Sequence, residues 1–193
     1  MQYHQIAVIG MSGRFAQSET LLDFRRVLSR KQDWIAEVSE KRKRLLGLEP
    51  DADCIQLGSI EDIDCFDHKY LGIPSKEADF MSPEQRLGLE LATEAVLNAG
   101  YSLEQFRGKN CGVLVSSSEI AYNKERAAST SLSVLGNMKL MICGKIAYFL
   151  DLRAANAMYD AGCSSSLAAI HDACMKLMTE VSGGERQKAL LTR

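Results

Sequence analysis

The chain has 193 residues, a formal net charge of -2 and 46% hydrophobic residues, which is enough for one sizeable hydrophobic core. The near-neutral charge gives no basis for binding nucleic acid or an anionic membrane. No stretch reaches the apolar length of a membrane span, and the first residues lack the pattern of a signal peptide. We therefore expect a cytoplasmic protein.

The N-terminal third contains one predicted strand and one predicted helix. The short apolar run Ile6–Gly10 predicts a buried strand that ends at a glycine. Gly10–Gly13 then predicts a tight turn rather than a phosphate-binding loop, because no Lys-Ser/Thr follows and the dinucleotide spacing is absent. Residues 19–31 have helical periodicity. The charged stretch 36–58 predicts an irregular, solvated region, since acidic residues surround its basic run 41–44.

The middle of the chain has a well-marked helix start. Ser82 can cap the helix, Pro83 suits the first helical position, and Gln85 has the spacing of a capping box. Leucines and alanines then recur at helical spacing as far as the stop signal at residues 98–100.

The second half alternates strands and helices. Cys111–Val115 predicts a buried strand, residues 130–144 a helix, and Ala157–Tyr159 a further extended piece. The helix expected after Cys163 ends at Gly183–Gly184 and has one apolar face, formed by Leu167, Ile170, Cys174 and Leu177. This alternation predicts an α/β fold with a mainly parallel, mixed sheet and helices on both faces.

The cysteines are scattered without a CxxC pair. This pattern predicts neither a disulfide framework nor a metal site, and we expect no bound cofactor. Most of the six are expected to be small core residues: Cys54, Cys65, Cys111, Cys143, Cys163 and Cys174.

Cys163 is the candidate nucleophile. It follows a glycine between a predicted strand and a predicted helix, so we place it in the first turn of that helix. Free backbone N–H groups and the helix dipole there favour the thiolate, which is the nucleophilic form. The same N–H groups could hold an oxyanion during acyl transfer. The alternative from the residues alone is a buried structural cysteine.

Acyl transfer also needs an acid or a base, usually histidine. His171 lies eight residues after Cys163, which is roughly 12 Å along a helix axis and too far to reach the sulfur. Nothing in the sequence places His4 or His68 beside it. We interpret all three histidines as non-catalytic.

Several segments occur in the order typical of one enzyme family. Residues 6–15 read IAVIGMSGRF, residues 111–122 read CGVLVSSSEIAY, and residues 144–167 read GKIAYFLDLRAANAMYDAGCSSSL. Together with residues 57–101, they resemble the N-terminal half of a β-ketoacyl synthase, the condensing domain of modular polyketide synthases. The resemblance covers nearly the whole chain.

This resemblance implies a thiolase-like fold of two similar α/β halves around a five-layered core, usually a homodimer. It implies that Cys163 takes an acyl chain as a thioester from the phosphopantetheine of an acyl carrier protein. Decarboxylation of a carrier-bound malonyl unit and Claisen condensation would follow. We expect the 193 residues to be one ketosynthase N-terminal-type domain, truncated before the C-terminal half.

The chain also departs from the family pattern. The family's two histidines, its lysine and the glycine-rich loop that completes the oxyanion hole belong to the C-terminal half. Four further differences lie within the matched segments: Ala16 replaces a proline, Lys145 an arginine, Ala154–Ala155 a Gly-Pro, and Ala161–Gly162 a Thr-Ala.

Three functions remain open at this point. The first is condensation completed by a complementary C-terminal half or another synthase subunit, in an oligomer. The second is a non-catalytic module that docks a carrier protein or a full synthase. The third is an acyltransferase or thioesterase acting alone, which the missing base disfavours.

Overall fold

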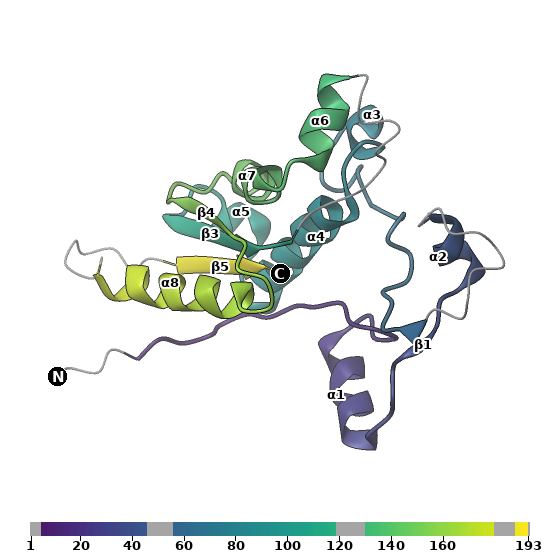
Figure 1. Ribbon diagram of the computed structural model, residues 1–193. Coiled ribbons are helices and arrows are strands. Elements are labelled where there is room, and N and C mark those ends of the chain that lie inside the picture. The colour runs from purple at the N-terminus through teal and green to yellow at the C-terminus, as the bar shows by residue number, and fades with distance from the viewer. Residues whose placement is uncertain (1–4, 46–55, 119–129, 180–187, 193) are drawn as a thin grey trace. The chain divides into compact units, whose positions relative to one another are not determined.

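Three parallel strands form the centre of the larger of the two units into which the chain divides (Figure 1). The computed structural model describes residues 5–45, 56–118, 130–179 and 188–192. Residues 1–11 and 66–193 belong to the larger unit, and residues 12–65 to the smaller one.

The central strand of this sheet is β3 (Cys111–Ser116), and all six of its residues are buried. β4 (Asn156–Tyr159) pairs with one edge of β3 and β5 (Lys188–Thr192) with the other, both in parallel. A continuous apolar run is typical of a parallel strand covered on both faces. The α/β fold and the parallel sheet are therefore confirmed.

Helices cover both faces of the sheet, and alternate residues of β3 point to one face or the other. Val113 and Val115 belong to a core cluster with residues of α4 (Pro83–Asn98) and α7 (Leu140–Phe149). Leu114 belongs to a second cluster with Ala169 and Ala173 of α8 (Ser165–Thr179). Figure 1 shows α8 on the face of the sheet opposite to α7. The two alanines leave α8 close to the sheet.

The predicted start of α4 is confirmed, but the capping box is not formed. Ser82 Oγ accepts a hydrogen bond from the Gln85 N–H at 3.4 Å, with proline in the first turn. The Gln85 side chain turns to another helix instead: its Nε2 donates to the carbonyls of Leu135 (2.9 Å) and Met138 (3.2 Å). These two carbonyls lie at the end of α6 (Ser131–Asn137), so Gln85 joins two elements fifty residues apart.

The helix predicted over residues 130–144 is in fact two helices. The backbone is extended at Met138, where α6 has ended, and α7 begins at Leu140. Two shorter helices, α3 (Ser75–Ala78) and α5 (Leu103–Phe106), complete the larger unit.

The strand predicted at Ile6–Gly10 is not formed. The described sheet has the order β4-β3-β5, and residues 5–10 pair with none of its strands. The apolar side chains of this segment are exposed instead, with Val8 at 77%. Gly10 lies against α4, where an added Cβ would approach the Ala95 carbonyl oxygen to 2.3 Å. This close approach explains the glycine better than a tight turn does.

The apolar face predicted for α8 is the outer face, not the core face. Ala169 and Ala173 are buried against the sheet, whereas Leu167 is 70% exposed and Ile170 45% exposed. Two alanines suffice to pack a helix close to a sheet, so the larger residues are free to form a separate apolar surface.

The smaller unit contains α1 (Leu21–Arg30), β1 (Ala36–Glu37), α2 (Glu40–Leu45) and β2 (Gln56–Leu57). The predicted first helix is confirmed. The stretch 36–58 is less irregular than predicted, because α2 forms and β1 pairs with β2 in antiparallel fashion. Residues 46–55 lie outside the described residues.

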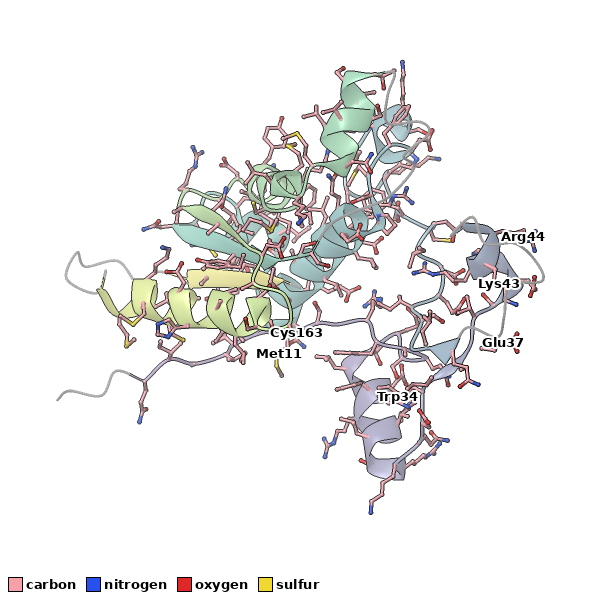
Figure 2. All side chains as sticks on the ribbon, viewed as in Figure 1. Met11, Trp34, Glu37, Lys43, Arg44 and Cys163 are labelled. Carbon is pink, nitrogen blue, oxygen red and sulfur yellow. The ribbon has the colours of Figure 1, made fainter. Side chains whose placement is uncertain are left out.

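The basic run of the smaller unit is paired with acidic residues. The Lys43 ammonium is buried and bonds to Glu40 (3.0 Å) and Glu37 (3.4 Å), and these bonds raise the pKa of Lys43. Lys43 is therefore not solvated, which differs from the prediction. Figure 2 shows Glu37 and Lys43 in this unit. Among the described helices, none has the length and apolarity needed to cross a membrane.

Candidate active site

Cys163 lies in the turn that joins β4 to α8. β4 ends at Tyr159 and α8 begins at Ser165, so the cysteine stands two residues before the helix rather than in its first turn. Its side chain is exposed, and Figure 2 shows it at the start of α8. This exposure argues against the alternative of a buried structural cysteine. Cys163 also follows the carboxyl end of a parallel strand. Ligands of open α/β sheets bind at this edge of the sheet.

The serines after Cys163 hold the turn rather than cap the helix. Ser164 Oγ donates to the Ala161 carbonyl at 2.8 Å. Ser165 Oγ accepts from the Ala161 N–H at 2.7 Å and donates to the Gly162 carbonyl at 2.8 Å. Gly162 has a φ of +57°, a conformation that favours glycine. Both residues before the cysteine are therefore held by serine hydroxyls.

Two of the N–H groups that we expected around the sulfur are already bonded. The Ser164 N–H donates to the Ala161 carbonyl at 3.3 Å, and the Ser165 N–H donates to the Gly162 carbonyl at 3.2 Å. Because the turn uses these donors, they are not available to an oxyanion in this conformation.

A lysine–aspartate pair ties the turn to a neighbouring helix. Lys139 Nζ lies 2.6 Å from Asp160 Oδ2, three residues before Cys163. Lys139 lowers the pKa of Asp160 by its hydrogen bond and charge, and the Gly162 backbone adds a smaller lowering. No pattern in the sequence predicts this pair, since its members are 21 residues apart.

Lys145 does not supply a cation to the nucleophile turn. Lys145 stands where the family has an arginine. Its ammonium is paired instead with the Glu77 carboxylate, in a part-buried ion pair between α7 and α3.

The structure describes two of the three histidines. His171 is an exposed residue of α8, about 9 Å of helix rise beyond Ser165. His68 has its Nδ1 2.8 Å from the Ile73 carbonyl oxygen. His4 lies outside the described residues.

The other described cysteines have different surroundings. Cys111 and Cys143 are buried, so two of the five described cysteines, rather than most of them, are core residues. Burial raises the pKa of the Cys143 thiol. Cys65 is exposed and Cys174 is partly buried. All five cysteines in the described residues are free thiols, and Cys54 lies outside that part of the chain.

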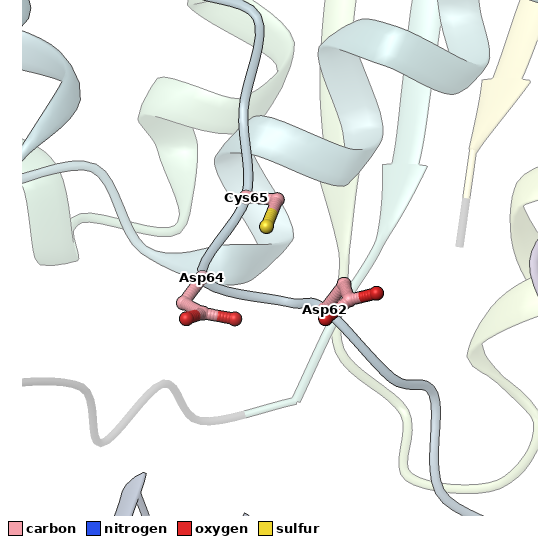
Figure 3. Close-up of side chains that lie close together, drawn as sticks. All are labelled: Asp62, Asp64 and Cys65. Atoms are coloured by element: carbon pink, nitrogen blue, oxygen red, sulfur yellow. The ribbon is translucent and has the colours of Figure 1, made fainter. Parts of the chain in front are cut away.

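Three exposed groups of the smaller unit lie close together: Asp62, Asp64 and Cys65, whose potential ligand atoms are within 4.8 Å of one another (Figure 3). The ammonium of Lys41 bonds to both carboxylates, at 2.7 Å to Asp62 and 3.0 Å to Asp64, and these bonds raise the pKa of Lys41. A side-chain cation therefore already balances the acidic pair.

The candidate site is thus an exposed cysteine between a parallel strand and a helix, on a three-stranded sheet covered on both faces. Residues 4–183 match the family model described as "Beta-ketoacyl synthase, N-terminal domain". The chain therefore belongs to the β-ketoacyl synthase family.

Its similar proteins include polyketide synthases of fungi and bacteria. The chain is 34% identical to 5-methylorsellinic acid synthase of Aspergillus terreus over 177 residues, and 35% identical to polyketide synthase PksM of Bacillus subtilis over 175 residues. Each match covers 89% of this chain. The chain spans only 7% and 4% of these two relatives.

Solved structures show the same fold. The ketosynthase from module 6 of the bacillaene synthase of Bacillus subtilis 168 superposes with a TM-score of 0.75 at 29% identity. The oxazolomycin ketosynthase domain KS7 of Streptomyces albus JA3453 superposes with a TM-score of 0.73 at 25% identity. The matches cover 91% and 90% of this chain but only 29% and 32% of those ketosynthase chains. The chain thus has the N-terminal part of a thiolase-like fold.

Proposed function

We propose that this chain is the nucleophile-bearing half of a ketosynthase in polyketide biosynthesis. The Cys163 thiolate attacks a carrier-bound acyl thioester, so that a new thioester forms on Cys163 and the phosphopantetheine thiol leaves. Loss of CO₂ from a carrier-bound malonyl unit then gives a carbanion, which attacks the acyl carbon. A carbon–carbon bond forms and the Cys163 thiolate is released. Both substrates are delivered on the phosphopantetheine of an acyl carrier protein, the extended product remains on the carrier, and the chain needs no cofactor of its own.

The exposed position of Cys163 is the observation that supports this proposal most strongly. The thiol lies in a turn with defined hydrogen bonds, at the carboxyl edge of the sheet, and is open to solvent. A docking module has no use for an exposed thiol at this place, whereas a carrier-delivered thioester must reach one.

Condensation requires groups beyond these 193 residues. His171 lies too far along α8 to reach Cys163, and His68 bonds to a backbone carbonyl. The family resemblance implies that two histidines, a lysine and an oxyanion loop belong to the C-terminal half. We propose that this half comes from a complementary polypeptide or from another part of the same synthase.

The outer face of α8 supports such a partner. Leu167, Ile170 and Met175 are 70%, 45% and 42% exposed, and exposed apolar residues gathered on one helix are typical of contact surfaces. We propose that the complementary ketosynthase half, in an oligomer, covers this face. Leu167→Glu should prevent the association. Tyr148→Glu is the control, because Tyr148 is 88% exposed on α7, on the opposite face of the sheet.

The test combines the chain with a ketosynthase C-terminal half, an acyl carrier protein loaded with an acyl group, and a malonyl carrier. We expect a β-ketoacyl product with both halves, and none with the chain alone or with Cys163→Ala. Product from the chain alone would overturn the need for a second half. Stable binding of the carrier without acylation of Cys163 under any condition would instead indicate the non-catalytic docking module.

A further inference from the structure

The side chain of Ser165 makes two hydrogen bonds to the residues just before Cys163. Ser165 is the first residue of α8 and is only 6% exposed. A hydroxyl has one proton to donate and lone pairs to accept. Ser165 Oγ accepts from the Ala161 N–H at 2.7 Å and donates to the Gly162 carbonyl at 2.8 Å. One buried hydroxyl therefore joins the start of a helix to the two peptide units that flank the Ala161–Gly162 peptide.

The other serines of the run have different surroundings. Ser164 is exposed, and among the described residues its Oγ bonds only to the Ala161 carbonyl. Ser166 is partly exposed, and its side chain makes no hydrogen bond to the described part of the chain. Ser165 is thus the buried member of the three, and it bonds on both sides of the Ala161–Gly162 peptide.

This turn needs such a restraint. Gly162 has a φ of +57° and no side chain, so its backbone is intrinsically free to leave this conformation. The backbone bonds across the turn are long, at 3.3 Å and 3.2 Å, whereas both Ser165 Oγ bonds are shorter than 3 Å. Cys163 is exposed at the far end of the turn, so the Gly162 conformation decides where its sulfur lies.

We propose that Ser165 is a positioning residue for Cys163. Its hydroxyl holds the peptide groups on both sides of the Ala161–Gly162 peptide and thereby fixes the direction of the thiol toward an incoming thioester. The catalytic part of this inference rests on the proposed role of Cys163 as the acylated residue. The structural part does not, because it concerns the turn alone.

The test uses the full chain with three substitutions. Ser165→Ala removes both bonds, Ser165→Thr keeps the hydroxyl, and Ser166→Ala is the matched control in the next position. The first measurement is hydrogen exchange of the Ala161 amide by NMR. We expect the Ala161 amide to be protected from exchange in the parent, in Ser165→Thr and in Ser166→Ala. In Ser165→Ala its protection should fall about tenfold, because the amide has lost its hydroxyl acceptor.

The second measurement is transfer of an acyl group from an acyl-pantetheine thioester to Cys163, compared with alkylation of the same thiol by iodoacetamide. A misplaced nucleophile loses far more in a reaction with strict geometry than in one without. We expect Ser165→Ala to slow acyl transfer about tenfold or more while alkylation changes by less than about threefold, and Ser165→Thr to restore the transfer.

Each outcome decides the inference. Equal exchange of the Ala161 amide in the parent and in Ser165→Ala would overturn it. An unprotected Ala161 amide in the parent would also overturn it, and this observation does not depend on the folding of any variant. Equal acyl transfer in both would remove the positioning role while leaving the proposed function intact. Absence of acylation in the parent would contradict the proposed function, and the exchange data would still decide whether Ser165 holds the turn.

Discussion

The ammonium of Lys139 lies 2.6 Å from the carboxylate of Asp160, so the start of α7 is tied to the turn that carries Cys163. This bond, followed by the Lys139 charge, lowers the pKa of Asp160. We predict that Lys139→Met raises the Asp160 pKa toward its ordinary value. Carbon-detected NMR titration of the carboxyl group measures it. Lys176→Met is the control, because Lys176 pairs with Asp172 instead.

The same pair gives a pH dependence with a defined sign. A carboxyl group whose pKa is lowered by folding stabilises the fold at pH values above its unfolded pKa, about 3.9, and loses this contribution as the pH falls through its folded value. The stability difference between parent and Lys139→Met should therefore be present at pH 7 and vanish in stronger acid. Urea unfolding at several pH values would measure this difference, and a constant difference across that range would contradict the assignment.

Gly136 lies against the backbone of another segment. An added Cβ there would be 1.8 Å from the Phe80 carbonyl oxygen, far inside contact distance, whereas a Cβ on Gly144 would meet nothing within 4 Å. We predict that Gly136→Ala destabilises the fold by about 1–3 kcal/mol, as overpacking does. Gly144→Ala, inside α7, should stabilise it by about 0.5–1 kcal/mol. Urea midpoints measure both. Equal effects of the two substitutions would show that the α6 contact with Phe80 is absent.

Tyr159 provides a spectroscopic marker for the packing of α8 on the sheet. Its hydroxyl donates to the Asp172 carboxylate on α8, and burial, this bond and the Asp172 charge raise the pKa of Tyr159 to about 12. Asp172→Asn should lower that pKa, because the acceptor charge is removed. Absorbance at the phenolate band against pH measures the pKa, and comparison with Tyr159→Phe identifies the part of the absorbance change that belongs to Tyr159.

A raised tyrosine pKa also limits stability in alkali. The contribution of the protonated Tyr159 is complete below the unfolded pKa of about 10 and is lost as the pH rises toward about 12. We predict that the parent loses more stability than Tyr159→Phe over this interval. Parallel loss in both proteins would mean that Tyr159 is not held against α8.

Local signals in the sequence predicted local structure well. The Ser82–Pro83 start fixed the beginning of α4, because capping depends on neighbouring residues alone. The apolar run at Cys111–Val115 predicted β3, because this signal also lies within the segment itself. The family motif around Cys163 identified the candidate site and the fold class.

Partners distant in the sequence could not be predicted in this way. Gln85 has the spacing of a capping box, yet its amide bonds to two carbonyls at the end of α6, because its side chain is fully buried and needs acceptors there. The Ile6–Gly10 run is apolar enough for a strand, but a strand also needs a pairing partner distant in the sequence, and this segment pairs with none of β3, β4 and β5. Helical periodicity showed that Leu167 and Ile170 share a face, but not which face the sheet would cover.

The central claim is that Cys163 accepts the acyl group. The chain, together with a complementary half, is incubated with an acyl-loaded carrier protein, and the adduct is mapped by mass spectrometry. Proteolytic cleavage after Arg153 and Lys176 leaves Cys163 and Cys174 on one peptide. Fragmentation of this peptide must therefore assign the acylated cysteine. The variant Cys174→Ser, which has only one thiol in the peptide, checks the assignment. We predict acylation of Cys163 and its loss in Cys163→Ala. An acyl group on Cys174 or Cys65, with none on Cys163, would contradict the account.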